Sequence, residues 1–220
     1  MEIDHIFICV TAGAPEAEAL KEFGLTEGSR NDHPGQGTAN RRFFFHNTYI
    51  ELLWLVDSQE ARSEITRPTM LFERLSDEGS GTSPFGICFR PANQGEKKAP
   101  FPSWSYRPAY LPSNLQVAIA ELAPLSEPMW FFLSFGSRPD AAAMERRQPL
   151  LHQTGFREAT SVRVSLPKFK QLSAPAICAA QSQSIGIAEG TVHLLEIGFD
   201  NEANGSSHDF RPILPLLFRW

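Results

Sequence analysis

Residues 1–56 carry the most regular alternation of apolar and polar positions in the chain. The run 2–10, "EIDHIFICV", alternates and is rich in β-branched and aromatic residues, which predicts a strand. The run 14–24, "APEAEALKEFG", has the composition and the end signals of a helix. Two apolar runs follow a polar loop in which we expect one short strand. This order predicts a βαβββ unit.

The two apolar runs, 40–45 and 48–56, predict a β-hairpin that turns at His46 and Asn47. Such a turn places Arg42 opposite Glu51, and alternation then separates two faces. We expect the first face to pack on the helix; it holds Phe43, Phe45, Thr48, Ile50, Leu52 and Trp54. The second face is a polar patch with aromatic walls; it holds Asn40, Arg42, Phe44, Tyr49, Glu51 and Leu53.

The first strand divides in the same way, with His5, Phe7 and Cys9 on one side. His5 and Glu51 are therefore expected to project together from the face away from the helix. A carboxylate and an imidazole that converge there could be ligand groups.

The remaining chain is less regular. Strands are predicted at 83–91, 115–122, 129–135 and 159–167, and helices in the second half of 58–79 and over 138–148. The run 184–199 predicts a last hairpin that turns at Glu189 and Gly190, in which Glu196 has the same facing as Glu51. We therefore predict an α+β fold of repeated βαβββ modules packed as one unit: a first module over 1–56, a second, irregular one over 57–135, and a degenerate third repeat with a C-terminal tail over 136–220.

Composition excludes several classes of protein. The chain has 220 residues, 42% of them hydrophobic, and a net charge of −5 with scattered Lys and Arg, so we expect no nucleic-acid partner. Its three cysteines stand far apart, which indicates neither a disulfide framework nor a zinc-thiolate site. No apolar segment approaches the roughly 20 residues that cross a bilayer. We expect a cytoplasmic protein without membrane contact.

Several motifs resemble those of the glyoxalase-like branch of the vicinal oxygen chelate superfamily, which includes glyoxalases, bleomycin resistance proteins and dioxygenases. They are "IDHIFICV", "HPGQGTAN" and "YIELL" in the first module, then "WFFLSF" followed by "HQTGFREATSVRVSLP". The resemblance implies paired βαβββ modules that form a cupped, incompletely closed mixed sheet, flanked by helices, around a small-molecule site.

The resemblance also implies a divalent metal, such as Zn, Fe, Mn, Ni or Mg, held by His5 and Glu51. In the second module the corresponding positions fall near Pro84 and Ser134, and neither is a convincing ligand. If the last repeat is the partner instead, Glu196 is its only carboxylate with suitable facing.

Further candidates would bind the substrate: Thr38, Asn40, Arg42, Phe44, Tyr49 and His152. In the loop "HPGQGT", backbone amides would join them as donors to an oxygen-rich ligand. Plainer readings stay open at this point. Glu51 and Arg42 could form only a cross-strand ion pair, His5 could be a core histidine, and His152 has no identifiable partner.

Two functions follow from these residues. The first is a metal-assisted lyase, isomerase or dioxygenase that acts on a small oxygenated metabolite, with Glu51 as the catalytic base. The alternative is a non-catalytic, metal-free protein that binds or sequesters a small molecule in the same cup. In either case the partner is a small molecule, and the chain is a monomer or a homodimer.

Overall fold

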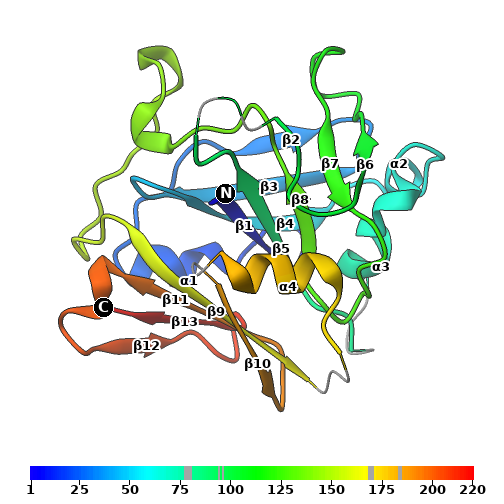
Figure 1. Cartoon of the computed structure of the whole chain (residues 1–220). Helices are drawn as coiled ribbons and strands as arrows, with labels where there is room; N and C mark the ends of the chain where they lie inside the picture. Colours follow the sequence, from blue (N-terminus) through cyan, green and yellow to red (C-terminus); the bar gives the residue numbers. More distant parts are fainter. Residues whose placement is uncertain (77–80, 94, 96, 168–170, 183–184) are drawn as a thin grey trace.

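The computed structural model describes residues 1–220 except 77–80, 94, 96, 168–170 and 183–184. Its first part forms the predicted βαβββ unit (Figure 1). β1 pairs in parallel with β4, β4 pairs antiparallel with β3, and β3 pairs antiparallel with β2. The elements are β1 (Glu2–Cys9), α1 (Ala17–Glu22), β2 (Asn31–His33), β3 (Thr38–Phe44) and β4 (Tyr49–Leu55).

The hairpin of β3 and β4 has the predicted register. Arg42 lies opposite Glu51 and Phe43 opposite Ile50, and the amide of Phe45 donates to the carbonyl of Thr48 across the turn. The apolar face of the hairpin is buried in one core with Ala17 and Leu20 of α1, as the alternation predicts. Its members in that core are Phe43, Phe45, Ile50, Leu52 and Trp54.

A second set of strands extends the same sheet. β5 pairs antiparallel with β1 and parallel with β8, which gives an eight-stranded sheet in the order β2-β3-β4-β1-β5-β8-β7-β6. The two halves of the sheet therefore repeat one strand order about the β1–β5 junction. The added strands are β5 (Phe85–Arg90), β6 (Ser103–Tyr106), β7 (Val117–Ala120) and β8 (Met129–Phe132).

Short helices connect the halves: α2 (Ser58–Ala61), the 3₁₀ turn η1 (Arg67–Thr69) and α3 (Leu71–Ser76). α3 confirms a helix in the second half of 58–79, although residues 77–79 lie outside the described part of the chain. The helix predicted over 138–148 is wrong. That stretch forms two short 3₁₀ turns, η2 (Pro139–Ala141) and η3 (Met144–Arg146), and Ala142 between them is in extended backbone, so no continuous helical ladder forms.

The C-terminal part forms a five-stranded sheet in the order β10-β9-β11-β13-β12. Its elements are β9 (Ala159–Pro167), α4 (Ala174–Gln181), β10 (Ile185–Gly190), β11 (Leu194–Phe199), η4 (Asp200–Glu202), β12 (Ser207–Asp209) and β13 (Leu216–Arg219). The hairpin predicted over 184–199 is wrong, because β9 lies between β10 and β11. The α4 crossover makes β10 parallel to β9. The local alternation of residues 184–199 cannot predict that a strand from elsewhere in the chain, β9, lies between β10 and β11.

Both helices α1 and α4 lie between the two sheets (Figure 1). Phe23, which follows α1, packs on Phe156, Phe210, Phe218 and Trp220. Ala176 and Ala179 of α4 are buried in the same core as Trp130 of β8. One face of the eight-stranded sheet is thereby covered, and the other face is left for the site.

None of the helices in the described part of the chain is both long and apolar enough to span a membrane. The division of the chain at residues 56 and 135 into three modules stays a prediction.

Candidate functional site

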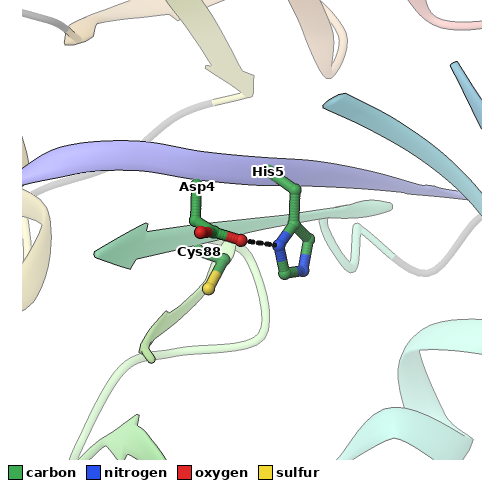
Figure 2. A group of neighbouring side chains, drawn as sticks. All are labelled: Asp4, His5 and Cys88. Carbon is green, nitrogen blue, oxygen red and sulfur yellow. Dashed lines mark hydrogen bonds and ion pairs between the residues drawn. The ribbon is translucent and has the colours of Figure 1, made fainter. Parts of the chain in front are cut away.

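A register shift in β1 brings two ionisable side chains to the same side of the strand. Ile3 pairs with Phe89 and His5 pairs with Cys88, so Asp4 is one residue extra between them. Such an irregularity breaks strict alternation. The donor atoms of Asp4, His5 and Cys88 consequently lie within 4.8 Å of one another, and Figure 2 shows the three side chains together.

The imidazole of His5 is held on both sides. Its Nδ1 lies 2.7 Å from Oδ1 of Asp4, and its Nε2 lies 3.9 Å from Oε2 of Glu51 on β4. The ring stacks on Tyr49 at a centroid distance of 4.6 Å and meets the edge of Phe131 at 5.4 Å. His5 and Glu51 thus converge, as the facing of β1 and β4 predicts.

These neighbours change the protonation of His5. Burial alone would lower the pKa of His5, but the charges of Glu51 and Asp4 and the hydrogen bond that His5 donates to Asp4 outweigh it, so the pKa is raised above its ordinary value. Glu51 itself accepts a hydrogen bond on Oε1 from Nδ2 of Asn40 at 2.8 Å. An imidazole with a raised pKa therefore stands between two buried carboxylates.

The cross-strand ion pair between Arg42 and Glu51 does not form, although the two residues are opposite each other in the hairpin. Arg42 donates instead to the carbonyl and the hydroxyl of Ser29, at 2.8 and 2.7 Å, and its guanidinium lies over Phe44. The carboxylate of Glu51 is therefore directed to His5 and Asn40. The interpretation of Glu51 and Arg42 as only a cross-strand ion pair does not hold.

A cavity of about 220 Å³ lies on this face of the sheet, opposite α1, and His5 and Glu51 line it. One wall, from the first half of the sheet, is polar: it includes Asn31, His33, Gln36, Arg42 and Tyr49. The facing wall comes from α3, the second half of the sheet and its loops, and is mostly apolar: it includes Leu71, Tyr106, Tyr110, Leu111, Val117, Ile119, Met129, Phe131, Leu133 and Phe135. The volume suits a small ligand with one polar and one apolar end.

A second hollow of about 460 Å³ adjoins the cavity and shares Ile119 and Met129 with it. Its lining contains neither His5 nor Glu51. We therefore take the smaller cavity as the candidate site.

The turn "HPGQGT" contributes side chains rather than amides. The amides of Gln36 and Gly37 donate to the carbonyl of His33, and that of Gly35 donates to Glu60, so the expectation that they face a ligand is wrong. Gly37 has a positive φ of 75°, and a Cβ there would lie 2.1 Å from the carbonyl oxygen of Asp57, so only glycine allows this tight turn.

Side chains of this turn form a hydrogen-bond network at the cavity wall. The hydroxyl of Thr38 lies 2.9 Å from Nδ1 of His33 and accepts from the side-chain amide nitrogen, Nε2, of Gln36. The side-chain oxygen of Gln36, Oε1, accepts from the hydroxyls of Tyr106 and Tyr110. The network links the turn between β2 and β3 to Tyr106 of β6 and to Tyr110, across the cavity.

Several predicted site residues do not line the cavity. Thr38, Asn40 and Phe44 are buried behind residues that do. His152 lies outside it: Nδ1 accepts from the amide of Thr26 at 3.0 Å, and Nε2 lies 2.9 Å from the carbonyl oxygen of Phe44. Glu196 belongs to the five-stranded sheet, where it accepts from Arg219. The roles assigned to these residues as ligands stay predictions, but the structure does not bring His152 or Glu196 to His5 and Glu51.

Asp4, His5 and Cys88 are the group of donors that could hold a metal in the described chain. Two features weigh against a tightly held ion there. Burial and then the charge of Asp4 raise the pKa of the Cys88 thiol well above its usual range, whereas metals bind the thiolate. Nη1 of Arg90, itself a cation, lies 3.9 Å from Oδ2 of Asp4.

On the cavity side, His5 and Glu51 offer two donors, whereas catalytic metal sites usually have three from the protein. The residues present do not fit a resident metal without rearrangement.

Sequence reasoning missed Asp4 and Cys88, because alternation places Asp4 on the other face and the shift in register has no signal in the sequence. The second-module position was also misplaced. Cys88 is the residue opposite His5, whereas Pro84 precedes β5 and Ser134 follows β8.

Comparison with known proteins agrees with this fold. Residues 3–171 match the glyoxalase-like domain family. A hypothetical protein from Staphylococcus aureus of known crystal structure is similar in fold, with a TM-score of 0.53 and 12% sequence identity over 99% of this chain and 98% of that one. A search among curated proteins found no match. Because the family match spans more than half of its length, the chain belongs to the glyoxalase-like domain family.

Proposed function

We propose that this protein binds a small oxygenated metabolite in the cavity, with the oxygen atoms at His5 and Glu51. One observation carries the proposal: the buried Asp4–His5–Glu51 cluster stands at one wall of a cavity whose facing wall is mostly apolar. Burying three ionisable groups costs free energy unless they are paired. Nε2 of His5 and Oε2 of Glu51 face the cavity, and such a buried ionisable cluster at a cavity is typical of a functional site.

The orientation of His5 favours chemistry as well as binding. Asp4 fixes Nδ1, so Nε2 points toward Glu51 and the cavity, in the manner of a carboxylate that orients a catalytic imidazole. A protonated Nε2 can donate to a carbonyl oxygen of the ligand. Oε2 of Glu51 can take a proton from the adjacent carbon, which yields an enol or enolate that the imidazolium stabilises.

This reaction class covers lyases and isomerases that act next to a carbonyl, and no step of it is routed through a metal. A dioxygenase would need a redox-active ion, and an analysis of metal content in protein purified without chelator tests for one. A stoichiometric transition metal would overturn the metal-free chemistry proposed here.

Deuterium incorporation separates catalysis from binding. We would incubate the protein in D₂O with small 2-oxo and 2-hydroxy carbonyl compounds and follow exchange of the adjacent C–H by NMR. Glu51→Gln should reduce exchange by about 10²–10⁴-fold while the fold is kept, because the base is lost. Glu189→Gln, an exposed carboxylate of the other sheet, is the matched control.

Binding without exchange in the wild-type protein would favour the alternative, a binding or sequestering protein. If none of these compounds bound to the cavity, or if Glu51→Gln and His5→Ala both bound them as the wild type does, the site assignment would be wrong.

A further inference from the structure

Arg42 is a cation at the cavity wall that lacks an acidic partner. Its two side-chain hydrogen bonds go to the carbonyl and the hydroxyl of Ser29, through Nε and Nη2. In the part of the chain that the structure describes, Arg42 forms no ion pair. The neighbouring Arg41, on the opposite face of β3, instead pairs with Glu18 and Glu27.

The guanidinium of Arg42 is nevertheless well placed. The two bonds to Ser29 and the Phe44 ring, 5.2 Å below, hold it in one orientation. Its Nη1 has no acceptor among the described residues. A positioned guanidinium with free N–H groups is the geometry that recognises a planar oxyanion.

The surroundings of Arg42 favour one negative charge on the ligand. Glu51 is engaged by His5 and Asn40 and does not neutralise Arg42. Asn31 also lines the cavity from β2 and can supply a further amide donor. The facing wall is mostly apolar and offers a dianion no second cation.

We propose that the natural ligand of this cavity is a monocarboxylate. Its carboxylate pairs with Arg42, and a further oxygen atom outside the carboxylate contacts His5 and Glu51. Its apolar body lies against β7 and β8. The inference rests on the proposed function, since it names the substrate class of the same site. Carboxylate is favoured over phosphate, because any positive charge on His5 is already offset by the carboxylates of Asp4 and Glu51, and a dianion would have only the guanidinium of Arg42 to balance it.

The test uses matched pairs of probes that differ only in charge. Each pair is a 2-hydroxycarboxylate and its carboxamide, with straight-chain, branched or aryl bodies of increasing size. Affinities are measured by ligand-observed NMR at low ionic strength. We expect at least one carboxylate to bind about tenfold or more tightly than its amide, because a charge-assisted hydrogen bond replaces a neutral one.

Arg42→Gln should abolish that preference while amide binding is retained. Arg30→Gln is the control, because Arg30 is an exposed arginine that pairs with Asp32 near the same edge. It should leave the preference unchanged. Inorganic phosphate should not compete with the carboxylates.

Equal binding of acids and amides, sensitive to Glu51→Gln but not to Arg42→Gln, would overturn the carboxylate class and leave the proposed function standing. A panel in which no carboxylate binds in preference to its amide would also overturn it. If Arg42→Gln and Arg30→Gln lost the preference for carboxylates equally, the net charge of the protein would explain it. That result would refute a direct contact between Arg42 and the carboxylate.

Discussion

His152 should make the stability of this protein fall in mild acid. The imidazole bridges two distant segments: its Nδ1 accepts from the amide of Thr26, and its Nε2–H donates to the carbonyl of Phe44. This pair of contacts requires the neutral tautomer with the proton on Nε2. Adding a proton to Nδ1 would set two N–H groups against each other at 3.0 Å.

The direction of this pH effect follows from the difference in proton binding between the folded and unfolded protein. Burial lowers the pKa of His152 in the folded protein, whereas the unfolded chain has the ordinary value of about 6.5. Above that pH both states are neutral and the contribution to stability is complete. Below it the unfolded chain takes up a proton that the folded protein does not, so stability falls by up to about 1.4 kcal/mol per pH unit until the folded pKa is reached.

The perturbation is His152→Gln, which keeps an amide donor for the carbonyl of Phe44 but cannot titrate. The variant should lose about 1–3 kcal/mol at pH 8, because the amide of Thr26 is left without its acceptor. Urea unfolding, followed by tryptophan fluorescence between pH 8 and 5.5, gives the free energy of unfolding. The decline below pH 6.5 should be shallower in the variant.

The comparison with the wild type matters because other histidines also titrate. Burial lowers the pKa of His33 and His193, while His5 is shifted the other way, and these contributions cancel in the difference. His208→Gln, at an exposed position, controls for the loss of one histidine. Identical pH slopes for wild type and His152→Gln would refute the neutral bridge and reopen a role for His152 in binding.

Two further changes test the packing around the site. In Gly86→Ala, the new Cβ would lie 2.0 Å from Cε1 of Phe7, so the ring must move into the cavity. Thermal unfolding should show that the free energy of unfolding falls by about 1–3 kcal/mol. An unchanged melting temperature would contradict this contact. Arg74 is buried and donates through Nη1 to the carbonyls of Ser83, Leu125 and Glu127. Arg74→Met should therefore lower the free energy of unfolding in urea by at least about 2 kcal/mol. An unchanged free energy would show that water replaces these hydrogen bonds.

The first module could be predicted from the sequence because its information is local. A two-residue turn and strict alternation set the pairing of Arg42 with Glu51, and one apolar face follows from that register. His5 and Glu51 converge for the same reason. Each of these inferences needs only neighbours in one hairpin and one parallel pairing.

The failures share a different cause, namely contacts between segments far apart in the chain. The pairing of β9 with both β10 and β11 removed the predicted last hairpin, and with it the suggestion that Glu196 shares the face of Glu51. The extra residue at Asp4 depends on the register of β1 against β5, which no local pattern records. Cys88 entered the site through that same pairing.

The repeated strand order gives this cup two unlike halves. Where the first half presents His5 and Glu51, the second presents Cys88 opposite His5, then Met129 and Phe131 on β8. The charged groups therefore lie on one side, and the other side is mostly apolar apart from the hydroxyls of Tyr106 and Tyr110, which donate to Gln36. The proposed ligand would consequently be oriented by polarity: its oxygen atoms would face β1, β3 and β4, and the bond that changes would be one near them.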